Sequence, residues 1–281
     1  MKAMGTFARI GLSGGEAFLY PELVKEVLDY AKAAGLPQRT VATNGFWGSW
    51  SDEKLDAVLG GMKESLTAVA FSHDAFHAEY VKTEYLWRAI KALERHGIRY
   101  TIHVADVYGE MGAGEFLARC EDLDVFYRHY KLYPLAAMGN AADLPEEIFV
   151  RTRPWEETCC NTENILSVHC DGGVYPCCCP GIFSTEFRLG SLHEMPLSEI
   201  VTKSPRMKYV NVMADPARFV KMLRYAREEL GVVFPDMTVN GCELCYMVFS
   251  QPGILEKLRP WIEEEYFDLL MTRLTGGEVA Q

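Results

Sequence analysis

The sequence predicts an α/β fold in its first half, followed by a cysteine-rich α+β region. Two observations predict this division. Short β-branched or apolar runs alternate with helical patterns through the first half, which is typical of a parallel sheet with crossover helices. Eight of the nine cysteines lie in the second half, and only Cys120 lies in the first. The two halves are therefore expected to carry different chemistry.

The apolar runs predict five strands, at residues 7–12, 40–43, 67–71, 99–104 and 125–132. Helical periodicity lies between them, at residues 21–34, 52–62, 84–96 and 114–121. The first of these helices opens with Pro21 and stops at Gly35, and the third stops at Gly97, as helix start and stop signals require. Ligands of such sheets gather at the carboxyl ends of the strands.

Composition excludes several classes of protein. The net charge of −11 is spread along the chain, whereas binding to a nucleic-acid backbone needs clustered Lys and Arg. The sequence has no apolar run long enough to span a membrane and no pattern of a signal peptide. We expect a cytoplasmic protein without membrane or nucleic-acid partners, in which cysteines serve metal or redox chemistry rather than disulfides.

Compact polar sequences follow the first three predicted strands. Gly14, Gly15 and Glu16 follow the first strand, Thr43 and Asn44 end the second, and the third ends in the sequence SHDAFH, residues 72–77. Each sequence alone is also compatible with an ordinary turn. Their recurrence at three successive strand ends favours a ligand site.

The GGE, TNG and S-x-D sequences at these strand ends resemble the radical S-adenosylmethionine superfamily. The resemblance implies a partial (β/α)6 barrel that lacks its first strand and helix. It also implies that Glu16, with the backbone of Gly14 and Gly15, receives the amino group of S-adenosylmethionine. Ser72 would reach the ribose, and Asn44 would shape the floor of the site. In the sequence related to the sixth strand of the family, Asn140 stands where the family has an arginine.

Asp74 and His77 have two interpretations. They could orient a substrate or move protons, because imidazole titrates near neutral pH and a carboxylate tunes it. Alternatively, Asp74 caps the following segment and His77 packs beside Phe76.

The superfamily holds its catalytic 4Fe-4S cluster on a C-x-x-x-C-x-x-C loop upstream of GGE, and no cysteine set in this sequence has that spacing. Because cysteine thiolates are the usual ligands of such clusters, we expect this chain alone to be inactive in radical chemistry. Two explanations remain open: the catalytic cluster belongs to a longer form of the protein, or the chain is a shortened protein without radical activity.

The second half contains a predicted cysteine-flanked hairpin, with strands at residues 165–169 and 174–175. Cys242 and Cys245 form a C-x-x-C pair that we place in a turn. Such a pair with a distant cysteine hairpin indicates a thiolate metal site, which either zinc or an iron-sulfur cluster could occupy.

This arrangement resembles the SPASM auxiliary-cluster domain and its shorter one-cluster relative, called twitch. The resemblance implies a 4Fe-4S cluster on Cys160, Cys177, Cys242 and Cys245, although Cys178 fits the G-x-x-x-x-C spacing as well as Cys177 does. A zinc site that staples a small subdomain is the alternative. The expected domains are residues 1–145, the partial barrel; residues 146–255, the SPASM or twitch-like domain; and residues 256–281, a C-terminal helix and tail.

Together the two resemblances imply an enzyme of the peptide-maturase type. Its cofactors would be S-adenosylmethionine and iron-sulfur clusters, its substrate a peptide or small protein, and its electron donor a flavodoxin or ferredoxin. The alternative is a noncatalytic iron-sulfur or zinc module that binds a peptide or partner protein.

Overall fold

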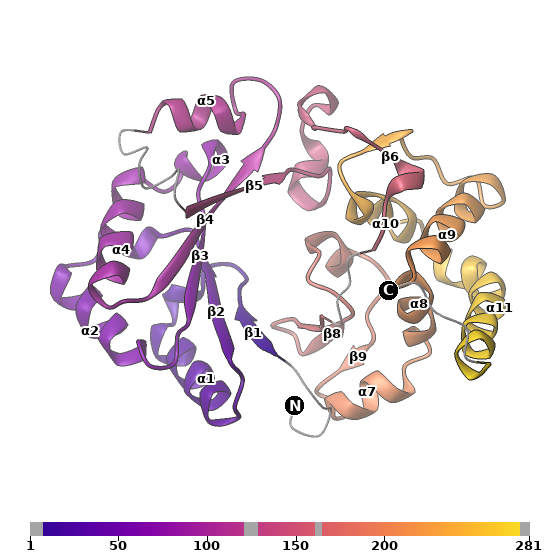
Figure 1. The fold of residues 1–281 in the computed structure, drawn as a ribbon, viewed down its shortest axis with the longest axis horizontal. Coiled ribbons are helices and arrows are strands. Elements are labelled where there is room, and N and C mark those ends of the chain that lie inside the picture. Colours follow the sequence, from indigo (N-terminus) through magenta and orange to yellow (C-terminus); the bar gives the residue numbers. More distant parts are fainter. Residues whose placement is uncertain (1–7, 121–128, 161–164, 276–281) are drawn as a thin grey trace. The chain divides into compact units, whose positions relative to one another are not determined.

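The computed structural model describes residues 8–120, 129–160 and 165–275. The chain divides into two compact units, Met1–Pro134 and Leu135–Gln281. Figure 1 shows helices and strands alternating along the first unit, whereas the second consists mainly of helices with short strands.

The first unit contains a five-stranded sheet in the order β1-β2-β3-β4-β5, and every neighbouring pair is parallel. This confirms the predicted class of fold for the first half. Its strands are β1 (Arg9–Leu12), β2 (Gln38–Thr43), β3 (Ala68–Ser72), β4 (Arg99–Asp106) and β5 (Tyr130–Pro134). The predicted fifth strand at residues 125–132 is shifted, because β5 runs to Pro134; residues 125–128 lie outside the described part of the chain.

Three helices of the first unit lie within one residue of the predicted bounds, whereas the helix expected at residues 114–121 spans residues 113–118, and a short helix at residues 75–78 was not predicted. Pro21 occupies the first turn of α1, and a glycine with positive φ follows α1 and α4, at Gly35 and Gly97; glycine adopts this conformation without steric cost. Ser51 caps α2 by accepting from the amide of Lys54. The helices are α1 (Pro21–Ala33), α2 (Asp52–Met62), α3 (Ala75–Ala78), α4 (Thr83–Arg95) and α5 (Ala113–Ala118).

The core of the first unit lies between the sheet and helices α1, α2 and α4, which lie along one face of it in Figure 1. Val41, Val69, Phe71 and Ile102 from three adjacent strands are almost completely buried. Alternate residues of a strand point to the same face, so these side chains form one apolar layer. That layer fixes the register of the strands, and the register brings their polar carboxyl ends together.

The second unit has two small sheets and five α-helices in its described residues. The predicted hairpin is confirmed as β7 (Ser167–Val168) antiparallel to β8 (Gly173–Tyr175), which also pairs with β9 (Gly190–Ser191). A separate antiparallel pair joins β6 (Arg153–Pro154) and β10 (Met237–Thr238). The helices are α7 (Leu197–Lys203), α8 (Met207–Met213), α9 (Pro216–Glu228), α10 (Gly241–Phe249) and α11 (Ile254–Leu274).

The core of the second unit is formed by apolar faces of α8, α9, α10 and α11. Phe219, Met222, Leu244, Phe249 and Ile262 are almost completely buried there. The predicted C-terminal helix is therefore present as α11 and packs on this core. It packs against α10, which carries Cys242 and Cys245.

Candidate functional site

The polar residues predicted from the first three strand ends lie at the carboxyl edge of the parallel sheet. The structure joins the first two ends through Glu16. The Oε1 atom of Glu16 accepts from the Thr43 hydroxyl at 2.7 Å and from the Phe18 amide at 3.0 Å, and Oε2 accepts from the Asn44 amide at 2.8 Å. Glu16 therefore connects the end of β1 to the end of β2.

The Thr43 side chain extends this network into the core. Its Oγ1 accepts from the Gly45 amide at 3.1 Å and from Nε1 of Trp47 at 3.0 Å. Both Thr43 and Trp47 are buried. The Asn44 side chain accepts from the Phe46 amide at 3.0 Å, which fixes the turn after β2. The edge is thus held by hydrogen bonds rather than by apolar contact alone.

Gly14 and Gly15 form the exposed part of this edge. Both have positive φ, 101° and 47°, and a Cβ atom at either position would meet no atom within 4 Å. Glycine is therefore required here for the backbone conformation and not for lack of space. An exposed backbone with this conformation lets a ligand approach the peptide groups closely.

The third strand end carries Ser72 and Asp74. Asp74 caps α3 by accepting from the His77 amide at 3.0 Å, and the same Oδ1 lies 2.8 Å from Nδ1 of the His77 ring. Its Oδ2 accepts from the Ala105 amide on β4 at 3.2 Å. Burial acts to raise the pKa of Asp74, but the hydrogen bonds from His77 and Ala105 outweigh it and hold the pKa below its ordinary value.

Asp74 is therefore a helix cap, as one interpretation predicted, and also the partner of the His77 imidazole; a role of the two residues in orienting a substrate or moving protons stays a prediction. The neighbouring His73 is completely buried, with Nε2 3.1 Å from the Thr83 hydroxyl. Burial lowers the pKa of His73 to about 4.

The second cluster of predicted residues surrounds the start of α10. Cys242 and Cys245 lie on this helix and not in a turn, which corrects the sequence-based expectation. The physical reason is the N-cap Asn240, whose Oδ1 accepts from the amides of Cys242 and Glu243 at 3.0 and 3.1 Å. A capped helix holds both cysteines in its first turns, where their orientation is fixed.

Two glycines let other cysteine-bearing segments approach α10. A Cβ on Gly241 would lie 2.3 Å from the carbonyl oxygen of Cys159, and one on Gly181 would lie 2.8 Å from the ring of Tyr246 on α10. The first approach brings the segment with Cys159 and Cys160 onto the helix. The second brings the segment after Cys179 onto it. Three segments distant in sequence therefore meet at α10.

The thiols of these segments interact. Those of Cys160, Cys177 and Cys179 all act electrostatically on Cys245, and those of Cys160 and Cys179 also act on Cys242. The structure thus brings together the four predicted ligands. Cys178 is exposed, whereas Cys177 is half-buried, so the structure favours Cys177 for the inward position.

Cys179 belongs to this group, although it is not among the four ligands predicted from the sequence. A hydrogen bond from the Cys242 thiol lowers the pKa of Cys179 to about 7. The same bond, with burial, raises the pKa of Cys242, and burial raises the pKa of Cys177 to about 12. The Cys179 sulfur also lies 3.4 Å from the Met138 thioether. Spacing alone cannot distinguish among three consecutive cysteines, so no sequence signal identified it.

The donor set suits an iron-sulfur cluster, because half-buried thiolates gathered from several segments are its usual ligands. Among residues 8–120, 129–160 and 165–275, no set of three or more His, Cys, Asp or Glu side chains is arranged to hold a metal ion. A single zinc ion needs tetrahedral thiolates at about 2.3 Å from the metal, and a four-iron cluster separates its thiolates more widely. The residues fit a cluster in the identity of their donor atoms.

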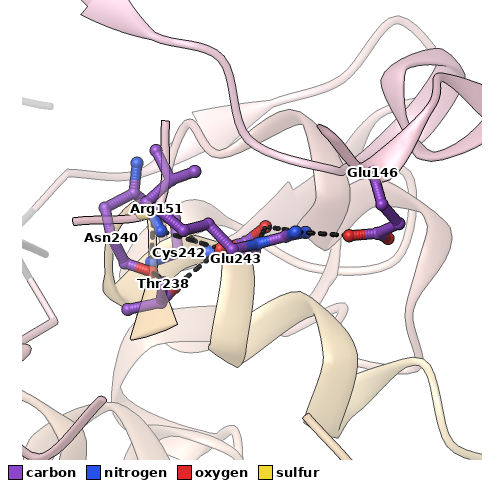
Figure 2. Close-up of polar contacts among 7 residues, drawn as sticks. Glu146, Arg151, Thr238, Asn240, Cys242 and Glu243 are labelled. Carbon is purple, nitrogen blue, oxygen red and sulfur yellow. Dashed lines mark hydrogen bonds and ion pairs between the residues drawn. The ribbon is translucent and has the colours of Figure 1, made fainter. Parts of the chain in front are cut away.

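A buried ion pair at α10 was also not predicted from the sequence. Glu243, between the two cysteines, is completely buried. Its Oε1 accepts from Nε and Nη2 of Arg151 at 3.0 and 2.8 Å, and its Oε2 accepts from the Thr238 hydroxyl at 2.6 Å and the Val239 amide at 2.9 Å. Figure 2 shows Arg151 between Glu243 and a second carboxylate, that of Glu146. A glutamate within C-E-L-C gives no sequence signal of burial.

Comparison with known proteins bears on both halves. Residues 159–227 match the family model of SPASM, an iron-sulfur cluster-binding domain; the match includes Cys160, Cys177 and Cys179 and ends before Cys242. The Bacillus subtilis (strain 168) protein described as "Putative peptide biosynthesis protein YydG" is 25% identical over 283 residues, which cover 93% of this chain and 83% of that protein.

Two solved structures are also similar. "Native anSMEcpe with bound AdoMet" matches with a TM-score of 0.46 and 12% identity, over 95% of this chain and 87% of that one. "Native anSMEcpe with bound AdoMet and Kp18Cys peptide" matches with a TM-score of 0.49 and 12% identity, over 93% and 86%. In the described residues, no helix combines the length and apolar character needed to cross a bilayer. The chain therefore contains a match to a SPASM iron-sulfur domain in its second half, and over most of its length it is similar to a protein whose name refers to peptide biosynthesis.

Proposed function

We propose that this chain is a peptide-modifying enzyme of the radical S-adenosylmethionine type, whose second unit holds an auxiliary 4Fe-4S cluster on Cys160, Cys177, Cys242 and Cys245. The observation that carries the proposal is the meeting of these thiols at α10, within and just beyond the residues that match the SPASM model. Cysteine thiolates are the usual ligands of iron-sulfur clusters.

The first unit supplies the cosubstrate site in this proposal. Gly14 and Gly15 offer exposed peptide groups to the methionine part of S-adenosylmethionine, and Glu16, held by the Thr43 hydroxyl, offers negative charge to its amino group. Ser72 lies at the end of β3, where it can reach the ribose. When bound, S-adenosylmethionine would supply the radical chemistry, while these residues bind and orient it.

A peptide is the proposed substrate class. The support is the similarity to a protein whose name refers to peptide biosynthesis. The proposal includes a flavodoxin or ferredoxin as electron donor, because an auxiliary cluster exchanges electrons one at a time.

One observation favours a second function, that of a noncatalytic module that holds a cluster or zinc and binds a peptide or partner protein. No cysteines in the sequence have the C-x-x-x-C-x-x-C spacing of the catalytic cluster loop. Binding of S-adenosylmethionine to the anaerobic chain, measured by calorimetry, distinguishes the two functions. Binding that is lost in Glu16→Ala supports the enzyme, and absence of binding at full iron content supports the module.

The experiment that tests the auxiliary site is anaerobic purification with quantitation of iron, sulfide and zinc. We expect about four irons and four sulfides per chain, and loss of both when Cys242 and Cys245 are replaced by Ala. Replacement of the exposed Cys170 and Cys178 by Ala is the matched control and should leave the iron content unchanged. One zinc without iron would refute the proposal.

A further inference from the structure

The carboxylate of Glu243 is saturated by donors. Two come from the Arg151 guanidinium, one from the Thr238 hydroxyl and one from the Val239 amide, at 2.6 to 3.0 Å. Glu243 is completely buried, and the Arg151 side chain is 13% exposed. Removing two charges from water costs several kcal/mol per ion, and a buried pair frequently contributes no more stability than apolar residues of the same size. Stability alone does not explain a charge at this position.

The position of Glu243 on α10 explains it better. Successive residues of an α-helix are rotated by about 100°, so Cys242 and Cys245 lie about 60° apart on one face. Glu243 lies about 130° from the middle of that face. The Glu243 carboxylate therefore forms its hydrogen bonds on the side of α10 away from the two thiols. Any rotation of α10 that breaks these four hydrogen bonds also turns both thiols away from the other cysteines of the site.

Arg151 belongs to the segment that leads through β6 to Cys160. The Arg151–Glu243 pair thus joins two segments that each carry proposed ligands, and Figure 2 shows it beside the capped start of α10. The approach of Gly241 to the carbonyl of Cys159 joins the same two segments directly before Cys242. Together these contacts fix the separation of Cys160 from the C-x-x-C pair.

We propose that Arg151 and Glu243 are positioning residues for the thiolate site, which set the rotation of α10 and its distance from Cys160. The inference rests on the proposed auxiliary cluster. Replacing residues that orient the ligands of a metal typically lowers metal affinity about 10- to 100-fold.

The test uses Glu243→Gln and Arg151→Lys. All four partners of Glu243 donate hydrogen bonds, so either orientation of a Gln amide puts its NH2 group against a donor. Lysine keeps the charge of Arg151 but cannot donate two bonds in a fixed fork. The matched control is the pair Arg218–Glu265, with side chains 15% and 14% exposed, which joins two helices without cysteines, α9 and α11. Its variants are Glu265→Gln and Arg218→Lys.

Iron content, the visible absorption of the cluster and the rate of cluster loss to a chelator are measured on the full chain, together with thermal unfolding of the metal-free proteins. We expect Glu243→Gln and Arg151→Lys to accelerate cluster loss by about tenfold or more, and both control variants to lose the cluster at the wild-type rate despite a similar loss of thermal stability.

Cluster loss at the wild-type rate in Glu243→Gln and Arg151→Lys would overturn the inference while leaving the proposed function intact. The same holds if the control variants lose the cluster equally fast, or if the two variants are unfolded without metal, because the pair would then be a general stabiliser. A wild-type chain without iron would instead refute the proposed function, and the inference with it.

Discussion

The burial of His73 predicts a defined loss of stability in mild acid. The folded-state pKa of His73 is about 4, whereas an unfolded histidine titrates near 6.5. Above pH 7 the residue is neutral in both states. As the pH falls below 6.5, the unfolded chain binds a proton that the folded chain does not, so the free energy of unfolding decreases. The decrease ends near pH 4, where the folded state is protonated as well.

The size of the effect follows from the difference of about 2.5 pH units between the two pKa values. At about 1.4 kcal/mol per unit, His73 contributes a loss of about 3.5 kcal/mol across the whole window, of which about 2.5 kcal/mol has occurred by pH 4.5. The charged groups that act on His73 are Asp74, which raises its pKa, and His77, which lowers it. Their effects are smaller than that of burial.

Urea unfolding followed by circular dichroism, at pH 7.5 and pH 4.5, measures this loss. The wild-type chain contains other acid-sensitive groups, so the comparison is with His73→Gln, which keeps a polar group near the Thr83 hydroxyl but does not titrate. We expect the difference in unfolding free energy between the two pH values to be about 2.5 kcal/mol smaller in His73→Gln. Equal differences in the two proteins would refute the argument.

Three further predictions concern the two sites. Gly241→Ala should destabilise the second unit by about 3 kcal/mol and lower the iron content, because the new Cβ would lie 2.3 Å from a carbonyl oxygen. Thermal unfolding and iron assays measure both effects. The control is Gly114→Ala, whose Cβ meets no atom within 4 Å. Thr43→Val should destabilise the first unit by about 3 kcal/mol, since the Trp47 indole loses its acceptor, and an unchanged urea midpoint would contradict this. Cys179→Ser should keep its iron, because the proposed ligands are the other four cysteines, and loss of iron would make Cys179 a ligand.

The sequence predicted the first unit well because its signals are local. The helix α2 has the expected bounds, α1 ends one residue earlier than expected, and α4 is shifted by one residue at both ends, since proline, glycine and capping residues act within one turn. The second unit was predicted less completely. Helices α7, α8 and α9 were not anticipated, although α9 does carry local start signals, because Asp215 caps it and Pro216 occupies its first turn.

The candidate sites show the same difference. The strand-end residues were found because parallel strands end at one edge, so that sequence order is enough to group them. The packing of distant segments on α10 decides which thiol of residues 177–179 faces inward. The same packing buries Glu243. Pattern and spacing carry no information about such packing.

The three consecutive cysteines after β8 have a practical consequence for chemical labelling. Cys178 is exposed while its two neighbours are half-buried, so one short run of identical residues contains two kinds of thiol. A maleimide dye would mark Cys178 and Cys170 on the intact molecule, and the thiols of the proposed cluster site would become reactive only when the cluster or the local fold is lost. The protein therefore carries its own reporter of the site's integrity, readable by counting labelled thiols in a mass spectrum.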